Sequence, residues 1–419
     1  MTDSATSSPA APTMRLRRMV GRDIGQGHRA ATPLELLFDL TFVVAFGLAA
    51  DQTAHLLAEG HVRPALLGFG FAMFAVVWAW INFTWFASAF DTDDWFYRIT
   101  TFVQMIGVIV LALGLPVMFH SLDAGTLFDN DIMVAGYVVM RVAMIAQWLR
   151  VAVQDPAHRR VALTYLVFVT AAQAGWVGLL FLRETPWWIF LPATLITVFL
   201  DVGGVVIAER RAGGTPWHPH HIAERYGLLV IIALGEVIFG MIASVSAVIQ
   251  EQSWSTEAIL LIVAGLALTF GMWWVYFILP SGEVLALHRE RSFGWGYSHL
   301  LIFAAIAATG AGLHVAAYVL EGVAHISNQA AVLTVVVPEF VFIVALFGTY
   351  TALVRNLDVF HFLLLGAALV VLVAAVLLAG AGVGFDISLL VACLAPAVIV
   401  FGYETLGHRH QAAVLARLR

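Results

Sequence analysis

The sequence contains no lysine and only one cysteine, and charged residues are scarce along its whole length. Charged residues make up 11% of the 419 residues and hydrophobic residues 61%, a balance that a water-soluble domain of this size would not tolerate. The lone Cys393 excludes a disulfide within the chain and any site that needs a cysteine pair. The P-loop, GxSxG, HExxH and helix-opening GxGxxG motifs are also absent. We therefore expect no enzyme, no metal site and no cofactor, although acids and histidines at a membrane interface could in principle act on lipids.

What the sequence does contain is a series of hydrophobic runs of roughly 20 residues, each long enough to cross a bilayer as a helix. These runs predict an all-α polytopic membrane protein that has the lipid bilayer as its partner. We expect twelve spans, at residues 34–58, 64–89, 97–119, 131–153, 160–182, 187–207, 222–248, 257–280, 293–319, 330–353, 360–382 and 387–406.

The arginines predict the orientation of these spans. If the N-terminus is cytoplasmic, only Arg63 and Arg183 fall outside and Arg141 falls within a span, so 18 of the 21 basic residues lie on the cytoplasmic side. This asymmetry predicts that both termini are cytoplasmic. The arginines near the N-terminus are explained as a topology anchor, so we expect no nucleic-acid partner.

An internal repeat is predicted from matching positions in the two halves of the chain. Asp39 and Asp51 are twelve residues apart in the first span, and Glu224 and Glu236 are twelve residues apart in the seventh. Two parallel six-helix repeats related by an axis along the membrane normal would explain this pattern. Other matches are Trp80 with Trp273 and Arg98 with Arg291, both offset by 193. The expected divisions are a disordered basic tail (1–30), the first repeat (31–208), a linker (209–220), the second repeat (221–408) and a second tail (409–419).

Acidic residues inside the spans are the main functional candidates, because a charge at membrane depth is costly unless it is paired, hydrated or protonated. We expect Asp39, Asp51, Glu224 and Glu236 to bind protons or a cation. Glu35 shares a helix face with Asp39, and His55 shares one with Asp51. The residues expected to form supporting ion pairs are Glu35, Arg98, Arg141, Arg225 and Arg291.

Several other polar residues admit two interpretations. Asp201 can bind a ligand or form a structural hydrogen bond, and His299 and His314 can relay protons or simply be hydrogen-bonded in the core. The aromatic clusters at residues 78–85 and 273–276 can pack or line a cavity. The histidines 218, 220 and 221 are expected in a solvated loop rather than in a metal site.

Three stretches of this sequence resemble the bacterial low temperature requirement A (LtrA) family. They are PLELLFDLTFVVAF at 33–46, FASAFDTDDWFYR at 86–98 and HIAERYGLLVIIALGEVIFG at 221–240. The resemblance puts these residues at motif positions: Glu35, Phe38, Asp39, Glu224, Arg225, Gly227, Gly235 and Glu236. It implies a bacterial membrane protein but neither a substrate nor a mechanism. A looser likeness to two-repeat potassium channels lacks the serine of their F-S-D motif.

Three functions remain open at this point. The first is a secondary transporter of the bacterial inner membrane that uses the carboxylates of the first and seventh spans. The second is a passive ion channel through the same helices. The third is a non-transporting scaffold whose acids only form internal ion pairs. The sequence leaves the substrate, the coupling ion, the direction of transport and the oligomeric state open.

Overall fold

The structure is a computed structural model that describes residues 16–23, 25–26, 29–357 and 359–418. Within these residues every regular element is a helix, and twelve helices or helix chains are long and apolar enough to cross a membrane. The predicted all-α class and the twelve spans are thus confirmed. The elements are α1 (Pro33–Ala58), α2 (Val62–Phe90), α3 (Trp95–Asp123), α4 (Asp131–Gln154), α5 (Arg159–Leu180), α6 (Trp187–Val198), η1 (Phe199–Gly203), α7 (Gly204–Arg211), α8 (Pro219–Gln252), α9 (Thr256–Phe277), α10 (Ser281–Leu287), η2 (Arg289–Arg291), α11 (Ser292–Leu320), α12 (Asn328–Val354), α13 (Val359–Gly380), α14 (Phe385–Ala392), α15 (Leu394–Gly402), η3 (Tyr403–Gly407) and α16 (His408–Leu418).

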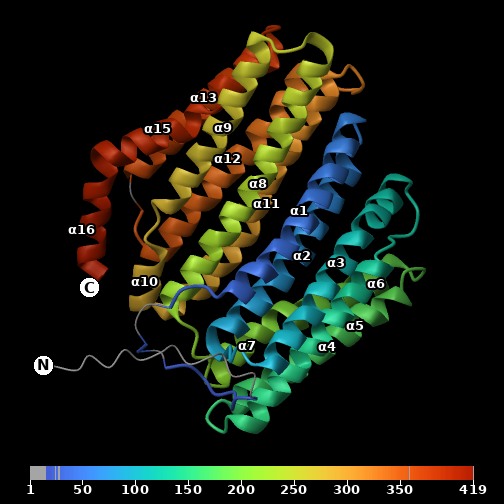
Figure 1. The fold of residues 1–419 in the computed structure, drawn as a ribbon, viewed down its shortest axis with the longest axis vertical. Coiled ribbons are helices and arrows are strands. Elements are labelled where there is room, and N and C mark those ends of the chain that lie inside the picture. Colours follow the sequence, from blue (N-terminus) through green and yellow to red (C-terminus); the bar gives the residue numbers. More distant parts are fainter. Residues whose placement is uncertain (1–15, 24, 27–28, 358, 419) are drawn as a thin grey trace, which may run out of the picture.

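The helices form two groups on either side of a shared centre (Figure 1). Helices α3 to α6 lie on one side, and α9, α12, α13 and α15 lie on the other. Between them α1 packs against α8 and α11, and α2 also contacts α11. Because α1 and α2 belong to the first half of the chain and α8 and α11 to the second, the centre of the molecule is an interface between the two halves.

Helices α1 and α8 run parallel through this centre. Glu35 on α1 contacts His221 on α8, and one turn further along Asp39 contacts Arg225. Still deeper, Gly47 lies against the carboxylate of Glu236. An axis along the membrane normal between two parallel repeats would bring equivalent positions together in this way.

Each half also ends in a span that contains a π-helical turn, η1 in the sixth span and η3 in the twelfth. Such turns are rare and often mark functional positions, so their occurrence at matching places supports the repeat hypothesis. The cytoplasmic location of both termini stays a prediction.

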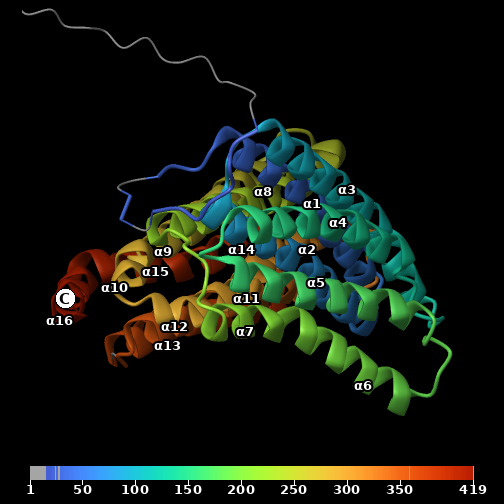
Figure 2. The ribbon, with the colours of Figure 1, turned by 90° about the horizontal axis from the view of Figure 1, so that it is seen from below.

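The described residues that precede α1 lie over one end of the bundle, which we call the Arg-rich end (Figure 2). The Arg17 N–H donates to Asp94, the Met19 N–H to the side chain of Gln154 and the Gly21 N–H to Asp155. Residues 17–21 are therefore tied to the α2–α3 and α4–α5 loops, in a part of the chain that the sequence assigned to a disordered tail. Residues 1–15 of that tail are outside the described residues.

Asp94 is the centre of this anchoring. It caps α3 by accepting from the Tyr97 N–H, and both terminal nitrogens of Arg150 donate to it, Nη1 at 3.0 Å. Burial by itself would raise the pKa of Asp94, but the hydrogen bonds from Arg150, Tyr97 and Arg17 outweigh burial and lower the pKa to about 2. The ionised carboxylate is thus the form that the fold stabilises.

Replacing Asp94 tests this anchor. We expect Asp94→Asn to lower the free energy of unfolding by roughly 2–4 kcal/mol at pH 7, because Arg150 is left buried without its partner. The ionised Asp94 stabilises the fold above the ordinary aspartate pKa of about 4, and this contribution is lost as the pH falls toward 2. The thermal unfolding temperatures of wild type and variant in detergent should therefore differ at pH 7 and converge toward pH 2. A difference that stays constant over this range would contradict the account.

Candidate functional site

A cluster of charged side chains joins the N-terminal ends of α1 and α8, and we call it the interface cluster (Arg29, Glu35, Asp39, His221 and Arg225). The start of α1 is built around Glu35, which completes a capping box with Thr32 behind Pro33. The same carboxylate accepts from Arg29 Nη2 at 3.3 Å and lies 3.2 Å from His221 Nε2. Glu35 therefore both begins α1 and holds α8 against it.

The ion pair between Asp39 and Arg225 is the deepest contact of the interface cluster. Arg225 Nη2 donates to Asp39 Oδ1 at 2.6 Å, and Trp80 Nε1 on α2 donates to the same oxygen at 2.7 Å. The guanidinium also lies over the Trp80 ring, 5.8 Å from its centroid. Both charged side chains have no exposed surface, so the pair tolerates the loss of neither partner.

The interface cluster is not fully hydrogen-bonded within the protein. Among the described residues, four buried polar atoms of this cluster have no partner: Asp39 Oδ2, His221 Nδ1, and Nε and Nη1 of Arg225. An unsatisfied buried donor or acceptor costs about 1–3 kcal/mol, so such atoms gather where a structure has a reason to retain them. The unused capacity would allow Arg225 and Asp39 to change partners.

Glu236 lies further along α8, where α1, α8 and α11 meet. A Cβ on Gly47 of α1 would come within 3.3 Å of Glu236 Oε1, and a Cβ on Gly310 of α11 would clash with the Glu236 backbone. Two glycines thus provide the space for this residue. Glu236 is 3% exposed, and no hydrogen bond or ion pair to it is found within the described residues. It is a buried carboxyl group without a charged partner.

Polar residues continue from Glu236 toward the end opposite the Arg-rich end. The ring of His314 on α11 touches the position that a Gly240 side chain would take, and its Nε2 has no partner among the described residues. Asp51 of α1 interacts electrostatically with His314, and one turn on His55 contacts the ring of Tyr318. We call the contact zone of α1, α8 and α11 the central seam, from Asp39 through Glu236 to His55.

The other residues expected from the sequence lie outside the central seam. Glu224 is half-buried at the start of α8 and accepts from the Ala31 N–H at 3.3 Å. Arg98 forms an exposed ion pair with Asp93. Arg291 donates to the Leu353 carbonyl and lies 3.7 Å from Glu290. The structure therefore brings Asp39, Asp51 and Glu236 into one zone and leaves these three residues at the Arg-rich end.

Arg141 lies in a second polar cluster, between α2, α4 and η1. It donates to Asp201 at 2.8 Å and to Asn82 at 3.1 Å. Asp201 also accepts from the indole N–H groups of Trp78 and Trp176, so all of its strong contacts are made within the first half. Of the two interpretations of Asp201, this geometry favours the structural one.

Of the three histidines at the start of α8, His220 is exposed as expected, but the prediction for His218 and His221 is wrong. His218 and His221 are buried and not in a solvated loop, because His218 caps α8 and faces the Gln26 carbonyl while His221 reaches Glu35. His299 is satisfied at both ring nitrogens, by the Trp295 carbonyl and the Tyr276 hydroxyl, which favours a structural role. No group of three or more His, Cys, Asp or Glu within the described residues is placed to hold a metal ion.

Comparison with known proteins shows to which family this chain belongs. The model of the bacterial low temperature requirement A protein (LtrA) matches residues 30–396, which include the whole central seam. This chain belongs to the LtrA family. The LtrA match thus confirms the resemblance seen in the three motif stretches. A curated relative, an uncharacterized protein of Rhizobium meliloti (strain 1021), is 27% identical over 292 residues, which are 66% of this chain and 67% of the relative. No solved structure matches.

Two arginines expected to form supporting ion pairs allow a matched test of burial. We expect Arg225→Leu to lower the free energy of unfolding by about 3–5 kcal/mol, because it strands Asp39 in the core. The exposed pair of Arg98 with Asp93 should contribute less than about 1 kcal/mol, so Arg98→Leu is the control.

The free energy of unfolding is measured by denaturation in detergent. The proteins compared are both variants and the double variant Asp39→Asn with Arg225→Leu. The double variant should regain much of the lost stability, since no buried charge is left unpaired. Equal, mild effects of Arg225→Leu and Arg98→Leu would show that the central pair does not hold the two halves together.

Proposed function

We propose that this LtrA-family protein is a proton- or cation-coupled secondary transporter of the bacterial inner membrane, in which Glu236 carries the coupling ion. The observation that supports the proposal is the position of Glu236: it lies inside the bundle, between the two halves, without a charged partner. Ionisable residues in such positions are costly to keep and often belong to ion pathways.

The surroundings of Glu236 supply what a carrier of this kind needs. On the Arg-rich side, the buried pair of Asp39 and Arg225 closes the seam, and its unused hydrogen-bonding atoms would let it open by exchanging partners. On the opposite side, His314 and Asp51 provide polar groups along the same helices. Rocking of the two halves about α1 and α8 would then expose Glu236 alternately to each side.

A second candidate is the non-transporting scaffold, and one observation favours it for part of the site. Asp39 and Glu35 are both held by basic side chains, as a purely structural role requires. The scaffold offers no reason for Glu236, however, because an apolar residue in its place would avoid the cost of burying a carboxyl group. We therefore assign structural pairing to Asp39 and Glu35 and ion coupling to Glu236.

The test uses purified protein in liposomes, with internal pH and membrane potential followed while proton, potassium and sodium gradients are imposed in turn. We expect wild type to move an ion and Glu236→Gln to lose this movement while keeping its thermal stability. Glu339→Gln is the matched control, because Glu339 on α12 is also fully buried with both oxygens unpartnered among the described residues but belongs to neither α1, α8 nor α11.

The control should keep the ion movement. Normal movement in Glu236→Gln would remove this residue from the mechanism. Equal loss in both variants would mean that any buried carboxyl group matters in the same way, which contradicts a specific role for the central seam.

A further inference from the structure

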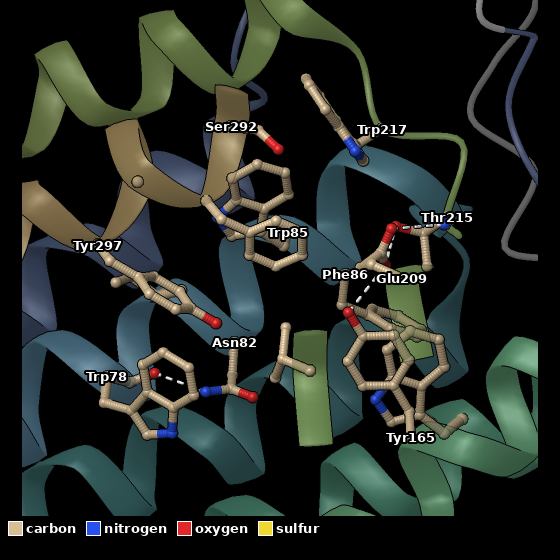
Figure 3. A pocket seen from close by; sticks show the side chains of 15 residues that line it. Trp78, Asn82, Trp85, Phe86, Tyr165, Glu209, Thr215, Trp217, Ser292 and Tyr297 are labelled. Atoms are coloured by element: carbon tan, nitrogen blue, oxygen red, sulfur yellow. Dashed lines mark hydrogen bonds between the residues drawn. The ribbon is translucent and has the colours of Figure 1, made fainter. Parts of the chain in front are cut away.

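A pocket at the Arg-rich end lies beside the central seam and shares only Trp78 and Asn82 with the clusters described above. Its space, including the part open to solvent, is about 580 Å³ and lies between α2, α4, α5, α7, α11 and the linker before α8 (Figure 3). The lining therefore combines both halves of the chain with the linker that joins them. A ligand here would touch each of the parts that move relative to one another in the proposed transporter.

The walls of this pocket are aromatic on nearly every side. Trp78 and Trp85 come from α2 and Tyr297 from α11. The remaining indole and phenol rings in the lining are Trp148, Tyr165 and Trp217. Aromatic faces carry partial negative charge and attract cations, and several rings around one space form the type of cage that binds quaternary ammonium groups. The protein already uses one of these rings in this way, since the Arg289 guanidinium lies 3.9 Å from the centroid of Trp217.

Glu209 is the only formally charged residue in the lining. Its carboxylate accepts from the Tyr165 hydroxyl at 2.8 Å and from the Thr215 N–H and hydroxyl at 2.9 and 2.8 Å (Figure 3). No salt bridge to Glu209 is found within the described residues. The three neutral donors orient the carboxylate without forming an ion pair with it, and the charge of Arg289 acts on it from behind the Trp217 ring.

The second half contains a related pocket without this charge. Its space, including the part open to solvent, is about 460 Å³, and it is lined by α9, α12, α13, α15 and the η3–α16 region. An offset of 202 along the chain relates Trp148 to Tyr350 and Glu209 to Gln411, and all four residues line their respective pockets. The Gln411 amide donates to the Ile278 carbonyl instead of presenting an anion. Of these two pockets, the first-half pocket is thus the one that combines an aromatic lining with a carboxylate.

We propose that the first-half pocket binds an organic cation, such as a quaternary or aromatic ammonium compound, with Glu209 and the surrounding rings as its recognition groups. The proposal names the substrate class of the transporter proposed above, and its transport role rests on that function. Helix α2 connects the two sites: Trp78 and Trp85 line the pocket, and Trp80 between them donates to Asp39. Trp85 also donates to the hydroxyl of Tyr226 on α8 at 3.0 Å. Occupancy of the pocket can therefore act on the α1–α8 interface.

The experiment measures equilibrium binding in detergent, where no gradient is needed. The probes are benzyltrimethylammonium, benzyl alcohol and benzoate, which present the same ring with a positive, a zero and a negative charge. Isothermal titration and quenching of tryptophan fluorescence should show saturable binding of benzyltrimethylammonium only. We expect Glu209→Gln to weaken this binding about tenfold or more, since it removes the charge and keeps the size.

The matched control is Glu184→Gln, which removes an exposed carboxylate from the α5–α6 loop and should leave the affinity unchanged. If Glu209→Gln fails to fold, Glu209→Asp keeps the charge and should bind more tightly than Tyr297→Leu, which removes one ring of the cage. Preference for benzyl alcohol or benzoate would overturn the proposal. An affinity for the cation that Glu209→Gln does not alter would overturn it as well.

This design lets the binding proposal and the transport proposal be contradicted separately. Cation binding that survives in Glu236→Gln, together with ion movement that does not depend on Glu236, would leave the pocket standing and remove the proposed coupling. Ion movement that depends on Glu236, without saturable cation binding, would do the reverse.

Discussion

The fold depends on one contact, the buried ion pair of Asp39 with Arg225 between two parallel helices from opposite halves of the chain. Neither charged side chain has any surface exposed to water, so each is stable only while it faces the other. Trp80 completes the contact from α2, and Glu35 with His221 repeats the pairing one turn nearer the Arg-rich end. Charge therefore determines the register of α1 against α8. Apolar helix surfaces in lipid would determine this register only weakly.

The same register creates the contrast on which the functional account rests. Where the helices begin, acids and bases meet in pairs, and three turns deeper the Glu236 carboxylate lies against Gly47 without an ion-pair partner among the described residues. A membrane protein that merely needed cohesion would continue the pairs or fill the position with an apolar side chain. We therefore assign the paired end to holding the two halves together and the region of the unpaired carboxyl group to their relative movement.

Much of the fold follows from the sequence because hydrophobic run length alone predicts membrane spans, and all twelve were found. The importance of Asp39, Arg225 and Glu236 could also be anticipated, since charge inside a span is costly wherever it occurs. Their separation into a paired and an unpaired group could not, because it depends on which residue of α8 faces which residue of α1. The spacing of Asp39 and Asp51 gave no sign that one acid would meet an arginine and the other a histidine on α11.

Glu209 was missed for a different reason. In the sequence it stands beside two arginines at the edge of a linker, where a solvated charge is the ordinary expectation. Its role becomes visible only when α5, α11 and the linker close around it and supply the rings and donors. Burial of His218 and His221 escaped prediction in the same way, because their contacts with Gln26 before α1 and with Glu35 on α1 form only in the folded chain.

The most direct test of the account asks whether Glu236 lies on a route open to water and ions. Because Cys393 is the single cysteine, Glu236→Cys can be placed in a Cys393→Ala background and exposed to a small cationic thiosulfonate reagent from each side of the membrane in turn. Phe239→Cys, at a position on α8 that is 54% exposed on the outer surface of the bundle, serves as the lipid-facing comparison. The account predicts that the reagent reaches position 236 from both sides and position 239 from neither. Protection of position 236 from both sides, in a folded protein and under every imposed gradient, would contradict a pathway through the central seam.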